Sequence, residues 1–317
     1  MITIIAEAGI NHNGNIKKAF ELIDIAKDCG ADVIKFQTWK TKNVFNSNFN
    51  KEFITDLKKW EFDFKTFIKL KEYCIRKKIF FMSTPDDFES AKFLNKIQNT
   101  FKIGSGEINN HIFLKYIASF RKKIILSTGA SNLIEVKRAL ECILGQGMRK
   151  KDVTIMHCTS LYPTSFNDVN ILAINELKKL NVNIGYSDHT VGYEASIMAV
   201  ALGATTIEKH FTYNKNAMGP DHKMSLNPKE LKEFIATLRN AYLALGDGKK
   251  RPRMLEKKII KEIRKSFVAS KNISKNEFIN ISNVTLKRPA LGIQADNHKK
   301  VINKKSKKNY TVDDFIV

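Results

Sequence analysis

Two histidines, His189 and His210, each follow a short apolar run, and a segment rich in Ala, Met and Val separates them. Read as a strand, a helix and a second strand, residues 185–211 place both imidazoles at the carboxyl ends of neighbouring parallel strands, where α/β folds collect their reactive groups. Two imidazoles can hold a divalent metal ion whose remaining positions go to water and substrate. On spacing alone, two unrelated surface histidines explain the pattern equally well, so the rest of the chain must decide.

Polar side chains also follow the other short apolar runs. Carboxylates such as Glu7, Glu107 and Asp221 can orient hydroxyls or move protons, and lysines and hydroxyls beside glycine-containing turns can hold a phosphate group. Each feature alone is more typical of a helix cap, a solvated terminus or a structural hydrogen bond. Their recurrence at nearly every strand end indicates a site. The lysines and hydroxyls concerned are Lys35, Thr84, Lys102, Ser105, Ser127 and Ser187.

The elements that must position these residues alternate between short β-rich runs and amphipathic stretches. Eight such units within residues 1–245 predict a (βα)8 TIM barrel. A doubly wound open sheet is the alternative, but it needs no eighth strand and usually has a glycine-rich first turn, which is absent here. Ser131 is predicted to cap the helix after the fifth strand. The predicted strands are Thr3–Ala6, Val33–Phe36, Ile79–Met82, Thr100–Ile103, Lys123–Leu126, Val153–Met156, Val182–Gly185 and Ala204–Ile207.

The last quarter of the chain differs from the rest in composition and in the spacing of its apolar residues. Residues 246–264 are polar and highly charged and are predicted to form a linker with a short helix. From residue 265 to the end, short β-branched runs alternate with Asn, Ser and Lys, which predicts a small β-rich module. Residues 245–317 carry 19 Lys and Arg against 7 Asp and Glu, so about half of the chain's excess positive charge lies there.

The composition of the chain favours a globular protein over a membrane-spanning or secreted one. The chain has 317 residues, 43% of them hydrophobic, which is enough for one large core and a small second domain. No apolar run approaches membrane-spanning length, and the N-terminus does not read as a signal peptide. The four cysteines form no C-x-x-C pair, which favours free thiols in a reducing cytoplasm. A net charge of +22 would suit nucleic acid, an anionic surface or anionic substrates, and compositional bias is the alternative. Bias is favoured over nucleic-acid binding, because no basic run alternates with aromatic residues as in nucleic-acid platforms.

Ten motifs, in order along the chain, resemble those of the sialic acid synthase family, which condenses phosphoenolpyruvate with amino sugars to give nine-carbon sugar acids. The resemblance spans nearly the whole chain and implies a (βα)8 barrel followed by an antifreeze-like (SAF) module. It also implies a cytoplasmic enzyme that works as a homodimer. The motifs are IIAEAGINHNG, IKFQT, MSTP, FKIGSGEINN, ILSTGA, HCTSLYPT, GYSDHT, GATTIEKHF, GPDHKMSL and LKRPALGI.

The resemblance also implies roles for individual residues. His189 and His210 match the family's metal ligands, with Mn²⁺ or Mg²⁺ as the ion. Arg288 matches an arginine that the antifreeze-like module places over the partner's site across the dimer, and Glu107 is the candidate for proton transfer near C2 of phosphoenolpyruvate. The phosphoenolpyruvate positions are Lys35, Thr84, Lys102, Ser105, Ser127 and Ser187, and those that hold the open-chain sugar are Glu7, Gln37, Tyr162 and Asp221.

Departures from the family pattern concern the sugar rather than the reaction. Ser160 stands where the neuraminate branch typically has Asn, and the stretch between Thr38 and Phe67 is short. NHNG and GPDHK are closer to the legionaminic acid branch, which takes a 2,4-diacetamido-6-deoxy sugar. An N-acetylneuraminate or pseudaminic acid synthase is the alternative. A sugar-binding barrel without activity is disfavoured, because none of the matched metal or phosphate positions is lost.

Overall fold

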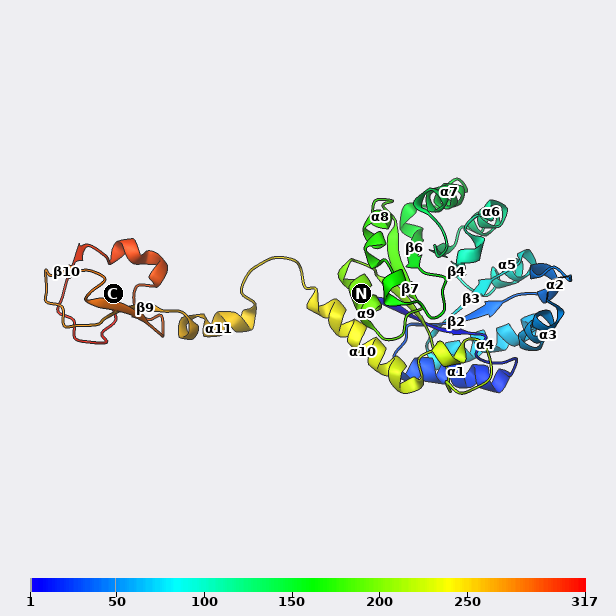
Figure 1. Ribbon diagram of the computed structural model, residues 1–317, viewed down its shortest axis with the longest axis horizontal. Helices are drawn as coiled ribbons and strands as arrows, with labels where there is room; N and C mark the ends of the chain where they lie inside the picture. The colour runs from blue at the N-terminus through cyan, green and yellow to red at the C-terminus, as the bar shows by residue number, and fades with distance from the viewer. Residues whose placement is uncertain (1, 49) are drawn as a thin grey trace. The chain divides into compact units, whose positions relative to one another are not determined.

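The computed structural model describes residues 2–48 and 50–317 (Figure 1). The chain divides into two compact units, Met1–Gly246 and Asp247–Val317, and each has its own apolar core. All four cysteines are free. In the described part of the chain, every helix is too short or too polar to cross a membrane.

The first unit is a barrel of parallel strands. The hydrogen-bonded order is β3-β2-β1-β8-β7-β6-β5-β4, and β3 and β4 lie side by side where the ring closes. Pairing of the first strand with the last rules out the open doubly wound sheet and confirms the predicted barrel. The strands are β1 (Thr3–Gly9), β2 (Val33–Thr38), β3 (Phe80–Pro85), β4 (Thr100–Ile103), β5 (Lys123–Ser127), β6 (Val153–Cys158), β7 (Asn183–Asp188) and β8 (Thr206–His210).

Seven of the eight strands run one to three residues further toward their carboxyl ends than predicted. Polar residues expected just after a strand, such as Glu7 and His210, therefore lie within it. Strand geometry continues there because backbone pairing does not depend on apolar side chains: Glu7 pairs with Lys35 on one side and with His210 on the other. The polar residues thus line the top of the barrel interior instead of projecting from flexible loops.

Helices surround the strands (Figure 1). Their apolar faces pack on the outside of the barrel and form the main core. The helix after the fifth strand is capped by Asn132, and not by Ser131 as predicted: the Asn132 side chain accepts from two backbone N–H groups and Glu135 completes a capping box, while Ser131 Oγ donates to the Thr128 carbonyl. The helices are α1 (Ile16–Asp28), α2 (Thr41–Val44), α3 (Lys51–Trp60), α4 (Phe64–Lys77), α5 (Phe88–Leu94), α6 (His111–Ser119), α7 (Leu133–Leu144), α8 (Ile174–Lys178), α9 (Glu194–Ala201) and α10 (Pro228–Ala244).

A second, smaller apolar cluster lies inside the barrel. Ile5, Val33, Met82 and Ile125 belong to it, together with Met156. Because side chains two residues apart on a strand point to the same side, the residues two places further along occupy the next layer up. In this way β1, β2, β3 and β5 each carry an apolar residue below and a polar one above, the polar ones being Glu7, Lys35, Thr84 and Ser127.

The second unit contains a helix, α11 (Met254–Ile263), and four short strands, β9 (Ser266–Ala269), β10 (Phe278–Ile279), β11 (Val284–Lys287) and β12 (Lys304–Lys305). Its core includes Phe267, Ile273 and Tyr310. The segment predicted as a linker is grouped with this unit, because Ala290 N donates to the Lys261 carbonyl and Arg288 Nε to that of Ile263, each at 2.7 Å.

Asp188 on β7 and Lys209 on β8 form a buried ion pair on the outer, helix-facing side of the barrel. Lys209 Nζ lies 3.0 Å from Asp188 Oδ2 and donates to the Thr190 carbonyl at 2.6 Å. Asp188 also accepts hydrogen bonds from Thr190 and from Ser196. Each residue of this pair directly precedes one of the two histidines at the top of the barrel, so the pair fixes the strand ends that carry them.

We expect Asp188→Asn or Lys209→Met alone to lower the free energy of unfolding by about 3–5 kcal/mol, because each leaves a buried charge without its partner. The double variant should lose less than the sum of the two, as measured in a denaturant double-mutant cycle. The exposed pair Lys18–Glu21 serves as control, since Glu21→Gln should change stability by less than about 1 kcal/mol. Simple additivity of the Asp188 and Lys209 effects would contradict the coupling.

Candidate active site

Four charged side chains form one buried layer near the top of the barrel. Lys35 Nζ lies 3.1 Å from Glu7 Oε2 and 3.6 Å from Glu208 Oε2, and it donates to Thr84 Oγ1 at 3.1 Å. Lys102 Nζ lies 3.3 Å from the other oxygen of Glu208. All four are at most 3% exposed. Glu208, on β8, therefore bridges two lysines that come from β2 and β4, the strands on either side of β3.

Burial and pairing shift the protonation equilibria of this layer in opposite directions. Burial raises the pKa of Glu7 and lowers that of Lys102. Burial also acts to raise the pKa of Glu208, but Lys102 and Lys35 outweigh it and hold that pKa below its ordinary value. Glu208 is thus a fixed negative charge, whereas Glu7 can take up a proton. Two ammonium groups that share limited negative charge, and that are shielded from water, are suited to bind an incoming anion.

Hydroxyls and a backbone N–H surround the lysines. Ser187 Oγ donates to Glu208 Oε1 at 3.0 Å, and Ser127 Oγ is buried without a hydrogen-bond partner among the described residues. Gly129 N donates to Ser105 Oγ at 2.9 Å. A Cβ on Gly129 would lie 2.2 Å from Ser160 Oγ and 3.0 Å from Ser105 Oγ. Only glycine at position 129 therefore lets both serine hydroxyls lie this close to the backbone. The predicted phosphate-binding residues therefore do gather in one place.

His189 and His210 lie beside one another, with ring centroids 5.7 Å apart. The Tyr162 ring lies 4.9 Å from that of His189 and 4.7 Å from that of His210. His189 Nδ1 is 2.7 Å from the Thr159 carbonyl, which it can contact only as a donor, so its Nε2 is left with a free lone pair. The two histidines therefore lie side by side and are not two unrelated surface residues.

Asp221 lies close to His210 and to Glu7. A Cβ on Gly9 would lie 3.2 Å from Asp221 Oδ2, 3.5 Å from Glu7 Oε1 and 3.6 Å from His210 Cε1, so these three side chains converge over one glycine. The φ of +51° at position 9 also favours glycine there. Burial raises the pKa of Asp221 to about 6. A carboxyl group with this pKa can hold or release a proton near neutral pH.

The two imidazoles fit a divalent metal. Burial, with help from His189, lowers the pKa of His210 well below its ordinary value, so the ring is neutral, and its Nδ1 is buried without a hydrogen-bond partner among the described residues. No group of three or more His, Cys, Asp or Glu in the described chain is arranged to hold a metal. An ion held here would therefore take its other ligands from water or substrate.

The remaining predicted site residues, Gln37, Glu107 and Arg288, lie in three different parts of the structure. Gln37 lies opposite Thr84 on the neighbouring strand. Glu107 is half-buried on the short 3-10 helix after β4, where Asn110 Nδ2 donates to its Oε2 at 2.7 Å and burial raises its pKa. Arg288 belongs to the second unit, so it is not among the residues that the barrel itself brings together.

Two residues of the site were given no role from sequence. Glu208 lies in the GATTIEKHF motif without a predicted role, and Asp86, after β3, is outside the predicted set. Burial raises the pKa of Asp86 to about 7, partly offset by Lys35. The signal for Glu208 was its place two residues before His210, which puts both on the inner face of β8.

The comparisons with known proteins agree with this geometry. The NeuB family model matches residues 22–250. The chain is 45% identical to N,N'-diacetyllegionaminic acid synthase from Campylobacter jejuni, over 99% of this chain and 98% of the relative, and 33% identical to pseudaminic acid synthase from the same organism, over 99% and 95%. It also superposes on the crystal structure of N-acetylneuraminic acid synthetase from Leptospira borgpetersenii with a TM-score of 0.76 and 36% identity, covering 82% of this chain and 90% of that one. This chain belongs to the NeuB family.

Proposed function

We propose that the protein condenses phosphoenolpyruvate, water and open-chain 2,4-diacetamido-2,4,6-trideoxymannose into the nine-carbon acid N,N'-diacetyllegionaminic acid and phosphate. The observation that carries the proposal is the buried layer in which Glu208 bridges Lys35 and Lys102 directly beside the paired histidines. The full-length likeness to a synthase of that acid supports the same reaction.

The lysine layer would bind phosphoenolpyruvate through its phosphate and carboxylate. C3 of phosphoenolpyruvate forms a bond to the sugar aldehyde carbon, and the aldehyde oxygen takes up a proton. Water adds to C2 and loses one proton, which balances the proton taken up by the aldehyde oxygen. The C2–O bond to phosphate then breaks, and the remaining hydroxyl on C2 passes its proton to the phosphate as the C2 ketone forms. Lys35 and Lys102 stabilise the anionic phosphate throughout, and Glu107, whose pKa is raised by burial, is the candidate for proton transfer near C2. The other contacts come from Thr84, Ser105, Ser127 and Ser187.

The sugar would lie next to the lysine layer, toward β1 and the loop that follows β8. Glu7 and Asp221, which converge over Gly9, can accept hydrogen bonds from sugar hydroxyls. Tyr162 contacts both histidine rings and is positioned to border the aldehyde end, with Gln37 on the neighbouring strand β2. A short loop and Ser160 leave room for a second acetamido group.

Mn²⁺ or Mg²⁺ would be held by His189 and His210, and when bound it would supply a Lewis acid to polarise the sugar aldehyde. The free ring nitrogens described above support this assignment. The chain's own contribution is to orient the His189 ring through the Thr159 carbonyl and to keep His210 neutral through burial. Burial also acts to lower the pKa of His189, but Cys158 and the Thr159 carbonyl outweigh it and raise that pKa, so an ion would take the place of a proton on this ring.

Metal dependence is tested with a chelator and with His189→Ala. Because two imidazoles make a weak site, excess chelator should abolish turnover and Mn²⁺ should restore it. His189→Ala should lose both activity and Mn²⁺ binding, the latter measured by electron paramagnetic resonance, while its circular dichroism spectrum stays that of the wild type. Full activity in excess chelator would disprove the assignment.

Sugar choice is tested with a panel of amino sugars, following phosphate release and product mass. The 2,4-diacetamido-6-deoxy sugar should show the highest kcat/KM, because Ser160 is smaller than the Asn of the neuraminate branch. A second acetamido group that finds one good hydrogen bond should gain about 0.5–1.5 kcal/mol, roughly 2- to 13-fold. A higher specificity constant for N-acetylmannosamine would place the protein in the neuraminate branch instead.

We further propose that the second unit is an antifreeze-like (SAF) module that serves a homodimer. Its short strands and small separate core support a module of this kind. Arg288 would close the partner's barrel, and the excess of positive charge in residues 245–317 would raise the local concentration of the anionic substrates.

Complementation between subunits tests this arrangement. Neither His189→Ala nor Arg288→Ala alone should be fully active. After subunit exchange, one site of each mixed dimer carries both lesions and the other carries neither, so a random mixture should regain about a quarter of the wild-type sites. Exchange confirmed by mass without any gain in activity would show that Arg288 serves its own chain's site or none.

A further inference from the structure

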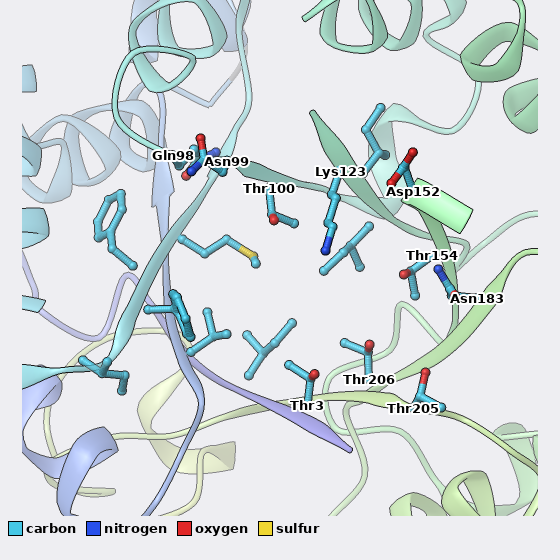
Figure 2. Close-up of a pocket in the computed structure, with 18 of the residues that line it drawn as sticks. Thr3, Gln98, Asn99, Thr100, Lys123, Asp152, Thr154, Asn183, Thr205 and Thr206 are labelled. Carbon is cyan, nitrogen blue, oxygen red and sulfur yellow. The ribbon is translucent and has the colours of Figure 1, made fainter. Parts of the chain in front are cut away.

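A cavity of the barrel lies at the end opposite the candidate active site. It has a volume of about 590 Å³ and is lined by the first residues of several strands, including Thr3, Phe80, Thr100 and Lys123 (Figure 2). Pockets that bind small organic molecules typically measure about 300–1,000 Å³. This cavity therefore has the size of a ligand site, and none of the residues described above for the reaction lines it.

The floor of the cavity is apolar. Ile5, Met82 and Ile125 line it and belong to the cluster inside the barrel. At its rim, Ile75 and Phe80 are 64% and 76% exposed, although both are large and apolar. Covering such side chains stabilises a complex by about 25 cal/mol for each Å² removed from water. The apolar part of a ligand would thus be well accommodated.

The polar groups of the cavity favour an anion. Lys71, Lys123 and Lys151 line it, and none of the three ammonium groups forms an ion pair or hydrogen bond within the described residues. Figure 2 shows the Lys123 side chain extended into the opening. The acidic residue of the lining, Asp152, is already paired with Arg149 at 2.6 Å. Hydroxyls that line the cavity without a side-chain hydrogen bond in the described structure are those of Thr3, Thr100, Thr154 and Thr206.

We propose that this cavity is a second ligand site, for a small molecule with an apolar or aromatic body and one anionic group, a carboxylate, sulfonate or phosphate. The anionic group pairs with Lys123 and the apolar body covers Ile75 and Phe80. The site is distinct from the one proposed for the reaction. Its floor residues Ile5 and Met82 lie two positions before Glu7 and Thr84 on the same strands, so one apolar layer separates the two sites.

The test is a fluorescence titration of the full-length protein with 1-anilinonaphthalene-8-sulfonate, which has an aromatic body and one sulfonate. We expect saturable binding at one site per chain. Lys123→Gln should weaken binding about tenfold, because it removes a charge-assisted contact. Thr100→Phe should block binding by filling the cavity. Lys137→Gln, on the exposed face of α7, is the matched control and should bind as the wild type does.

Saturating phosphoenolpyruvate should not displace the dye. Displacement, or equal affinity of wild type, Lys123→Gln and Thr100→Phe, would overturn the proposal; the second result would mean that the dye binds elsewhere, for example at exposed Leu255. If Thr100→Phe does not fold, Lys123→Gln decides alone, since Lys123 is exposed. The dye is measured without sugar or metal, so its outcome is independent of whether the proposed reaction is correct.

Discussion

Burial of two lysines and two glutamates inside one barrel is the constraint on which the site depends. An ammonium or carboxylate removed from water loses several kcal/mol of hydration, which only close pairing can offset. Here Glu208 sits between Lys35 and Lys102, and Glu7 completes the layer. Pairing with Glu208 and Glu7 outweighs burial and raises the pKa of Lys35, whereas burial lowers that of Lys102. In the proposed reaction, an anionic substrate would supply further negative charge beside these lysines.

The alternation of inward and outward side chains along each strand places the charged layer inside the barrel. It also separates this layer from the charged residues on the outer face of the strands. The inner residues of the strands are apolar at mid-height and polar at the top, while outward residues such as Asp188 and Lys209 form their own buried pair against the helices. His189 and His210 follow those two residues, so the same alternation that hides one ion pair presents two imidazoles to the site. The barrel thus holds the two imidazoles next to the buried charged layer, with the Asp188–Lys209 pair kept apart from both.

Much of this could be predicted from sequence, because apolar runs and helical periodicity depend on nearest neighbours in the chain. The sequence predicts all eight strands, but it places the ends of seven of them too early, since the residues there are polar. The Ser131 cap was wrong because Asn132 offers the better acceptor to the helix N–H groups. Glu208 and Asp86 were missed because their importance lies in burial beside lysines from distant strands, which no local pattern records. The dimer, the role of Arg288 and the cytoplasmic location stay predictions.

The central claim, that the buried lysine layer binds phosphoenolpyruvate, is tested most directly by isothermal titration of phosphoenolpyruvate in the presence of Mn²⁺ and without sugar. Wild type should bind one molecule per chain. Lys102→Met should weaken binding by about 10- to 150-fold, because a charge-assisted contact contributes about 1.5–3 kcal/mol, whereas Lys137→Gln on the outer face of α7 should have no effect. Unchanged affinity in a folded Lys102→Met variant would contradict the account.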